Sequence, residues 1–432
     1  MSERFDVIVV GNGVAGGLIA SDLRAAGRSV LLLEPKGGSA PRPAGGVLWR
    51  TDVAASPLGK GPGAPLLRRI VERRVGFLTS DAALSINFRD LAWATTSTGW
   101  VLDRAPAEAW ARGRAQRAGA TVVQDAVVEA VLADRAGRVT GVKAGGKSSE
   151  AALTIFEDPG VLPLAAKSGV RAGARSGGVG DESVVESVFD LPPSRVDDKF
   201  GAGPGRGFTF ETVLGYLPKG AMALGFVYPG NASVHVGVVV HDRSVSTSGI
   251  GPKEVMNRFE THPEIAPFLR GGARRSTTTL SIPTKRSSRM SLYGDGFLVV
   301  GDAALAGASS GIAVRGADLT LQSATAAAAT AREAIETKDT SGRMLARYPS
   351  RLRAAGMLDG LGQADPRAAR LRWNPRLHQA YPALLSSFFR RMMTEKGQPK
   401  EHLRSLLEET VKGSAVPYTA LGRDAVTAVF SL

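Results

Sequence analysis

Three glycines near the start of the chain, Gly11, Gly13 and Gly16, have the spacing of a turn that binds a dinucleotide. In such a turn the first glycine lets the chain reverse, the second lets the backbone approach a diphosphate, and the third lets the next helix pack closely on the strand. Glu34 lies 18 residues after Gly16, close to the roughly 20-residue spacing at which a carboxylate accepts hydrogen bonds from the adenosine ribose. An acid there disfavours a 2′-phosphate, so the pattern predicts FAD or NAD rather than NADP.

The residues around this turn predict the elements that must position it. Residues 5–10 are dominated by β-branched side chains, the pattern of a strand buried on both faces of a parallel sheet. Residues 14–26 predict a helix that ends at Gly27, and residues 29–33 predict the second parallel strand. A glycine-rich turn alone is a weak signal, but here the strand, the helix, the spacing and the acid agree. We therefore predict a dinucleotide site, with an ordinary strand–turn–helix as the alternative.

A second segment with similar features lies far along the chain. Residues 296–300 predict a strand that ends at Gly301 and Asp302, and Gly311 precedes a long alanine-rich helix predicted over residues 314–337. A helix N-terminus carries about half a positive charge and can stabilise a phosphate or a reduced flavin ring. Asp302 could accept hydrogen bonds from ribityl or ribose hydroxyls. Because glycine and aspartate are also common turn residues, a buried strand–turn–helix is the alternative for this segment.

The intervening sequence changes from a mixed pattern to an antiparallel one. Residues 106–118 predict a helix, and alternating strands bounded by turn residues extend from about residue 183 to residue 280. The predicted fold is α/β, with a Rossmann-type FAD-binding domain interleaved with an antiparallel-sheet substrate domain and a helical C-terminal region. The predicted FAD-binding domain comprises residues 1–182 and 286–340, the substrate domain residues 183–285, and the helical region residues 341–432.

Two histidines flank the strand predicted over residues 233–240. No third ligand stands at metal spacing with His235 and His241, so we predict no metal site and a structural or solvent-facing role for both.

Composition limits the classes of protein. With 432 residues, the chain exceeds the roughly 250–300 residues at which one hydrophobic core stops growing, so we expect two connected domains. Its 43% hydrophobic content is enough to form a large core. It begins with an apolar strand pattern and no secretory signal, so we expect a cytoplasmic protein. The absence of cysteine excludes disulfides, a thiolate zinc site and an iron–sulfur cluster ligated by this chain. An iron–sulfur partner would have to be another polypeptide.

Positive charge is concentrated toward the C-terminus. The formal net charge is +14, and residues 343–432 hold 15 lysines and arginines against 7 aspartates and glutamates. Charge alone does not decide whether this surface binds nucleic acid, anionic lipid or an acidic protein, or is simply a solvated surface. This region predicts helices broken at prolines 366, 375, 382 and 399. Residues 384–393 contain aromatic side chains next to cationic ones. A helix with this composition could bind a membrane surface, bind a partner subunit or pack on the protein's own core.

Several segments together resemble the FixC group of FAD-dependent oxidoreductases, relatives of electron-transfer-flavoprotein:quinone oxidoreductase and, more distantly, of geranylgeranyl reductases. The likeness covers nearly the whole chain. It is carried by residues 5–16, 45–49, 262–269, 301–304, 314–319, 374–377 and 381–382.

The resemblance implies FAD as the cofactor and electron transfer as the function. Electrons would pass from electron-transfer flavoprotein subunits toward quinone, accompanied by a separate ferredoxin-like subunit. A peripheral contact with the cytoplasmic membrane is left open, and we expect no nucleic-acid partner. The flavin performs the redox chemistry, so no catalytic side chain is predicted. Two alternatives remain: an isoprenoid reductase, with residues 221–228 lining a lipid tunnel, and a flavin-free structural subunit.

The resemblance also assigns cofactor contacts. Arg104 corresponds to the family's cofactor-contacting arginine, Val127 lies near the adenine, and Gly311 and Ile312 face the pyrimidine edge of the flavin. The complete predicted set is Gly11, Gly13, Val14, Ala15, Gly16, Glu34, Pro35, Lys36, Gly45, Gly46, Arg104, Val127, Asp158, Gly160, Gly301, Asp302, Gly311 and Ile312.

One stretch departs from the family pattern. Residues 157–160 read Glu-Asp-Pro-Gly where the relatives usually have Ala-Asp-Gly or Ala-Thr-Gly. Leu305 also follows Ala304 where a glycine is common. The stretch is either a plain turn or a second contact with the cofactor. These departures leave open a protein that keeps the fold and binds flavin poorly.

Overall fold

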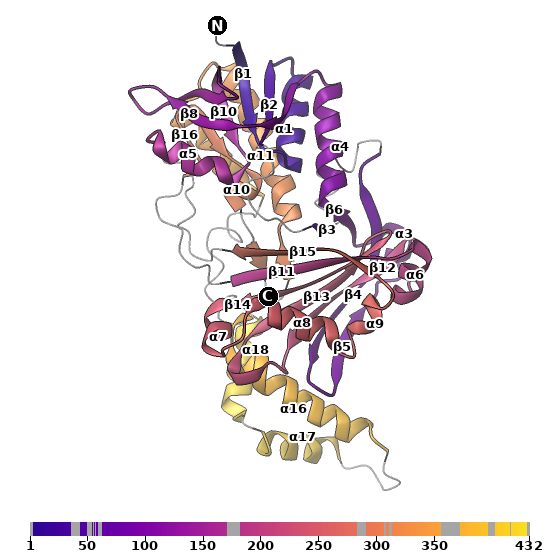
Figure 1. Cartoon of the computed structure of the whole chain (residues 1–432). Coiled ribbons are helices and arrows are strands. Elements are labelled where there is room, and N and C mark those ends of the chain that lie inside the picture. The colour runs from indigo at the N-terminus through magenta and orange to yellow at the C-terminus, as the bar shows by residue number, and fades with distance from the viewer. Residues whose placement is uncertain are drawn as a thin grey trace.

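The structure is a computed structural model. It shows two parts, each built around a β-sheet, with a pair of helices at the end farthest from the N-terminus (Figure 1). The described residues are 3–35, 44–49, 54, 56, 58, 63–170, 182–282, 291–305, 308–310, 313–355, 372–395, 402–414 and 416–429.

The first sheet contains the predicted dinucleotide-binding unit. Its strand order is β16-β17-β10-β1-β2-β7, and β1, β2, β7, β10 and β17 run parallel. The apolar ends of β1 and β2 are buried, as the β-branched and leucine-rich runs predict. The strands are β1 (Glu3–Val10), β2 (Val30–Pro35), β7 (Thr121–Ala126), β8 (Val128–Ala133), β9 (Val139–Ala144), β10 (Lys147–Phe156), β16 (Tyr293–Gly294) and β17 (Phe297–Val299).

Three helices pack together beside this sheet. Helix α1 contacts both α4 and α11. Gly17 of α1 lies so close to α4 that an added Cβ would be 2.6 Å from the Ala111 carbonyl carbon, so this helix crossing requires glycine. The helices of this part of the molecule are α1 (Val14–Ala25), α4 (Arg104–Arg117), α5 (Leu162–Lys167), α10 (Gly301–Leu305), α11 (Ala317–Glu336), α12 (Gly342–Leu345) and α13 (Arg347–Ala354).

The start of α11 differs from the prediction. The helix was expected from residue 314, but it begins at Ala317 because residues 313–315 form β19 (Ala313–Arg315), which pairs with β18 (Ala308–Ser310).

The second sheet is larger and mostly antiparallel. Its order is β15-β11-β14-β13-β12-β4-β6-β3, with β5 on β4 and a parallel pairing between β4 and β12. Its strands are β3 (Gly45–Trp49), β4 (Leu66–Leu78), β5 (Ala83–Phe88), β6 (Gly99–Asp103), β11 (Glu182–Asp190), β12 (Arg206–Leu214), β13 (Ala223–Pro229), β14 (Ser233–His241) and β15 (Ala273–Ile282).

The second sheet also contains strands from outside residues 183–285, the segment predicted to form it. Strands β3 to β6 come from the segment expected in the first part of the FAD-binding domain, yet they pair with the second sheet. Short helices pack on this sheet, and Phe259 of α8 fills the space that Gly225 leaves on β13. These helices are α3 (Trp93–Thr96), α6 (Pro193–Phe200), α7 (Asp242–Thr247), α8 (Pro252–Thr261) and α9 (Ala266–Leu269).

The C-terminal region is helical, as predicted, and is anchored to the second sheet. Arg372 forms a buried ion pair with Glu182 of β11 at 3.1 Å, and the Trp373 indole N–H donates to the same carboxylate at 2.7 Å. The helices are α16 (Pro375–Met393), α17 (Leu403–Lys412) and α18 (Tyr418–Val429).

Two details of this region bear on the predictions. Pro375 begins α16, but Pro382 lies inside the helix instead of breaking it, and its ring packs against Gly215. Prolines 366 and 399 lie outside the described residues. Among the described residues, no helix combines the length and apolar character that crossing a membrane requires.

Candidate cofactor site

The glycine turn lies between β1 and α1, as the sequence indicated. The Gly11 N–H donates to the Leu33 carbonyl at 2.9 Å, which holds the turn at the carboxyl ends of β1 and β2. Helix α1 begins at Val14, and Val14, Ala15 and Gly16 are buried in its first turn. Ligands of open α/β sheets bind at this edge, beyond the carboxyl ends of the strands.

The Glu157 side chain lies inside this turn. Glu157 follows β10 directly, is 2% exposed, and accepts a hydrogen bond on Oε2 from the Gly13 N–H at 3.0 Å. A Cβ added to Gly13 would lie 2.3 Å from Oε1, and one added to Gly16 would lie 2.4 Å from Oε2. A Cβ added to Gly11 would lie 2.6 Å from Oε2. The carboxylate therefore takes the place at which the spacing predicts a diphosphate.

Glu34 is the penultimate residue of β2, at the end of the strand where the sequence predicts the adenosine ribose. It is buried, and its Oε2 accepts hydrogen bonds from the Arg112 guanidinium at 3.0 Å and from the Gln124 side-chain amide at 3.4 Å. Sequence reasoning did not identify these two partners, although Arg112 lies on the helix predicted over residues 106–118. Val127 is exposed just after β7, and the strand partner of Pro35 is Ala126. The predicted adenine side therefore lies along β2 and β7.

Arg104 and Asp302, each predicted to contact the cofactor, form an ion pair with each other that the sequence did not indicate. Their Nη1 and Oδ2 atoms are 2.7 Å apart, which joins the first residue of α4 to α10. Gly301 has φ +54°, and its N–H donates to the Ser323 hydroxyl of α11 at 2.9 Å. A Cβ on Gly301 would lie 3.1 Å from Glu157 Cγ. Two segments about 200 residues apart thus border one turn.

Residues 158–160 form a local turn. Asp158 is buried, and its Oδ1 accepts a hydrogen bond from the Gly160 N–H at 2.8 Å, which caps the short helical turn Pro159–Val161. This geometry fits the plain-turn interpretation. A contact of Asp158 or Gly160 with the cofactor stays a prediction.

The strand β3 is an edge strand of the second sheet and contacts α11. A Cβ on Gly45 would lie 2.9 Å from the His235 ring, and one on Gly46 would lie 3.3 Å from Ala317 Cβ at the start of α11. Lys36, Gly311 and Ile312 lie outside the described residues.

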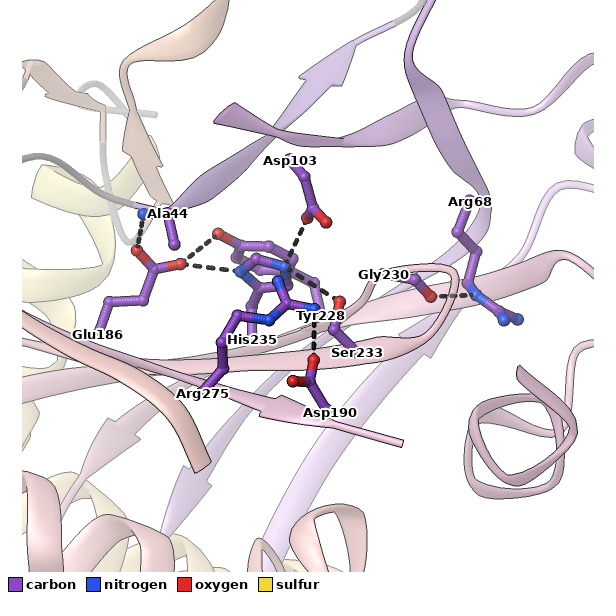
Figure 2. A network of polar contacts seen from close by, with 10 residues as sticks. All are labelled: Ala44, Arg68, Asp103, Glu186, Asp190, Tyr228, Gly230, Ser233, His235 and Arg275. Carbon is purple, nitrogen blue, oxygen red and sulfur yellow. Dashed lines mark hydrogen bonds and ion pairs between the residues drawn. The ribbon is translucent and has the colours of Figure 1, made fainter. Parts of the chain in front are cut away.

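A buried polar network lies directly behind β3 (Figure 2). His235 Nε2 lies 2.8 Å from Asp103 Oδ1, and Nδ1 lies 3.0 Å from Glu186 Oε1. Tyr228 donates to the same Glu186 oxygen at 3.0 Å and stacks on the imidazole. The Ala44 N–H donates to Glu186 Oε2 at 2.7 Å. The network joins the end of β6 and the residue before β3 to β11, β13 and β14.

This network changes the interpretation of His235. Burial opposes the imidazolium charge, but hydrogen bonds to Asp103 and Glu186 outweigh it and raise the pKa of His235 to about 9. His235 is therefore a buried cation between two carboxylates, a stronger role than the plain structural one expected. His241, at the end of the strand, instead accepts a hydrogen bond from the Ser244 N–H at 3.3 Å.

The described residues fit a dinucleotide only in part. The glycine turn and Glu34 lie at the carboxyl ends of parallel strands, where open α/β sheets bind nucleotides, and the Arg104–Asp302 pair joins α4 to α10 beside the turn. The Glu157 carboxylate does not fit, because it occupies the volume of a diphosphate and carries the same sign of charge.

Comparison with solved structures identifies the fold. The chain matches a geranylgeranyl bacteriochlorophyll reductase-like protein from Thermoplasma acidophilum with TM-score 0.66 and 17% identity, covering 96% of this chain and 97% of that one. It matches the FAD-dependent myxobacterial halogenase CndH with TM-score 0.59 and 16% identity, covering 97% and 99%. Both likenesses cover nearly the whole chain, and they confirm the predicted fold class.

Comparison with curated proteins gives the family. No family model matches the chain. Protein FixC of Salmonella typhi is 30% identical over 411 residues, which is 94% of each chain. The probable electron transfer flavoprotein-quinone oxidoreductase YdiS of Escherichia coli K12 is 29% identical over 412 residues, again 94% of each. The chain belongs to the FixC family, which confirms the predicted resemblance, the FAD-dependent oxidoreductase class and FAD as the cofactor of that class.

Proposed function

We propose that this chain receives electrons from an electron-transfer flavoprotein and passes them toward quinone, together with a separate ferredoxin-like iron–sulfur subunit. The observation that carries this proposal is the relationship to FixC and YdiS over 94% of the chain. FAD, when bound, would supply the redox chemistry, and transfer of electrons alone requires no acid–base side chain.

The residues of this chain would position the cofactor. The turn at Gly11–Gly16 and Glu34 lie on the adenosine side of the expected path, and the Arg104–Asp302 pair lies on the ribityl side. The N-terminal end of α11 is adjacent to β3 and can stabilise negative charge in front of it. The chain has no cysteine, so a cluster that relays electrons to it must be ligated by another polypeptide.

Electron exchange with both partners tests this proposal. We expect chemically reduced electron-transfer flavoprotein to bleach the visible absorbance of the FAD-loaded chain, and a soluble quinone analogue to restore it. Free FAD at the same concentration, without the chain, is the control for direct transfer between small molecules. Failure of the loaded chain to exchange electrons with either partner would contradict the proposal.

We also propose a peripheral membrane contact through α16 and α17. Leu403, Leu407 and Met393 are 61%, 46% and 67% exposed at this end of the molecule, where Figure 1 shows the two helices projecting from the second sheet. Arg390 and Arg391 lie in the last turn of α16. Exposed apolar side chains beside cations are typical of surfaces that bind anionic lipid.

Vesicle sedimentation tests this contact. The double substitution Leu403→Ser and Leu407→Ser should weaken binding to anionic vesicles about tenfold or more, since burying one leucine contributes about 1.5–3 kcal/mol. Leu91→Ser, at an 85% exposed leucine before α3, is the matched control and should leave binding unchanged. Equal binding of all three proteins would argue against this surface.

One observation favours a second candidate function, the flavin-free structural subunit. Glu157 occupies the glycine turn with a hydrogen bond to Gly13. Purified protein that is colourless and refuses added FAD would support this candidate, and yellow protein that releases FAD on denaturation would exclude it. The isoprenoid reductase gains no such support, because Ala221, Ala223 and Val227, in the segment expected to line a lipid tunnel, lie in the apolar core.

A further inference from the structure

The backbone of Glu157 is fixed beside the glycine turn. The N–H groups of Glu157 and Asp158 both donate to the Val10 carbonyl, at 2.9 and 3.1 Å, and the Glu157 carbonyl accepts from the Ala303 N–H at 3.2 Å. These bonds tie the residue to the end of β1 and to α10. Any side chain longer than alanine at this position must therefore extend along the surface of the turn.

The next residues strengthen this placement. Pro159 restricts the backbone of Asp158 to an extended conformation, observed at φ −82° and ψ 119°. The Asp158 side chain then caps Gly160. The Glu-Asp-Pro-Gly departure from the family pattern is therefore one coherent local structure that presents Glu157 to the turn.

The carboxylate supplies the anion that the helix end attracts. Helix α1 has no acidic residue in its first turn, and its N-cap is glycine with no side-chain cap. The positive end of a 12-residue helix favours an anion, and nucleotide-binding folds place the cofactor diphosphate there. Here Glu157 Oε2 accepts the Gly13 N–H bond instead.

The carboxylate and a diphosphate exclude each other. At each of the three glycines, one Glu157 oxygen lies within 2.6 Å of the position that an added Cβ would take. This is the space that the glycines leave open for close approach of a ligand. Two anions at this distance also repel each other.

We propose that Glu157 is an intramolecular competitor of the cofactor diphosphate, which closes the glycine turn in the cofactor-free chain and lowers its affinity for FAD. This inference rests on the proposed function, since it assumes that FAD is the ligand of the turn. Binding of FAD then requires the Glu157 side chain to leave Gly13, so retention of flavin depends on this one residue.

Calorimetric titration of the flavin-free full-length chain tests the proposal, with FAD and ADP as separate probes. ADP carries the adenosine and the diphosphate without the flavin. Glu157→Ala should bind both probes about 10- to 100-fold more tightly than the wild type, because the ligand no longer displaces a hydrogen bond to a charged group. Glu157→Gln, which keeps the volume and removes the charge, should lie between them. Glu150→Ala removes an exposed carboxylate from the same strand and should bind like the wild type.

A second measurement reports on the cofactor-free state. Glu157→Ala without ligand should melt about 2–4 °C below the wild type, since the end of α1 loses its anion. Saturating FAD should more than reverse this loss.

The outcomes separate this proposal from the proposed function. Equal affinity of wild type and Glu157→Ala for both probes overturns the role of Glu157, and tight FAD binding by all variants does so while supporting a flavin function. Tighter ADP binding by Glu157→Ala, without electron exchange by the FAD-loaded variant, supports the role of Glu157 and overturns the electron-transfer proposal. If no variant binds either probe, both are overturned.

Discussion

Replacing His235 with leucine is expected to lower the free energy of unfolding by about 3–5 kcal/mol, the usual cost of removing one partner from a buried ion pair. His235 is fully buried between Asp103 and Glu186. Leucine would leave two carboxylates facing each other without a cation. Urea denaturation measures the loss. His241→Leu, at the end of the same strand, is the control and should cost no more than about 1 kcal/mol.

The same substitution should change how stability depends on pH. The folded-state pKa of His235 is about 9, above the ordinary value of 6.5. A raised pKa means that the folded state holds the proton more tightly, so this stabilisation is complete below pH 6.5 and is lost as pH rises through about 9. The wild type should therefore lose stability across this range. His235→Leu should show much less of that decline, and an equal decline in both proteins would contradict the role of His235.

Replacing Arg68 with methionine should destabilise the second sheet by about 3–5 kcal/mol. The Arg68 side chain is 2% exposed and forms an ion pair with Asp197 of α6. It also donates to the carbonyls of Gly230 and Arg206 at 2.7 and 2.8 Å and to that of Asn231 at 3.2 Å. Methionine fills a similar volume but leaves all these acceptors without their donor.

The next residue in β4 provides the control for Arg68. The Arg69 guanidinium contacts the carbonyls of Ala94 and Thr95 at an exposed position. Arg69→Met should therefore change the free energy of unfolding by about 0.5 kcal/mol or less. Thermal and urea denaturation of the two variants provide the comparison. A similar loss for both would show that the buried network of Arg68 does not carry the stability assigned to it.

The local parts of the fold were predictable because their signals are local. The run of β-branched residues before Gly11, the spacing of the glycines and the acid at Glu34 lie within one 30-residue unit, and β1, α1 and β2 follow that pattern. The boundaries of α4 and β14 also lie near those expected, because apolar periodicity and turn residues determine them.

Pairing between distant segments was not predictable in the same way. Strand β4 pairs with β12, and β3 packs against α11, although nothing near β3 or β4 indicates these partners. His235 meets Asp103 and Glu186, which lie 132 and 49 residues away in sequence. A histidine on an apolar strand gives no signal of a distant carboxylate. The sequence therefore predicted only a structural or solvent-facing role for His235.

The candidate site contains residues that the sequence identified and contacts between them that it did not. Arg104 and Asp302 were each predicted as cofactor contacts from the resemblance, but only the structure shows that they form an ion pair with each other. Glu157 was recognised as a departure from the family pattern, but only the structure shows its carboxylate against the three glycines. The direction of a side chain depends on the surrounding backbone, here the bonds from Glu157 and Asp158 to Val10.

An experimental structure of the Glu157→Ala chain with FAD would test the central claim most directly. We predict the diphosphate along Gly11 to Gly16, with the adenosine ribose at Glu34 and the ribityl chain near Asp302. FAD bound elsewhere, or a glycine turn that stays without nucleotide at saturating FAD, would contradict it.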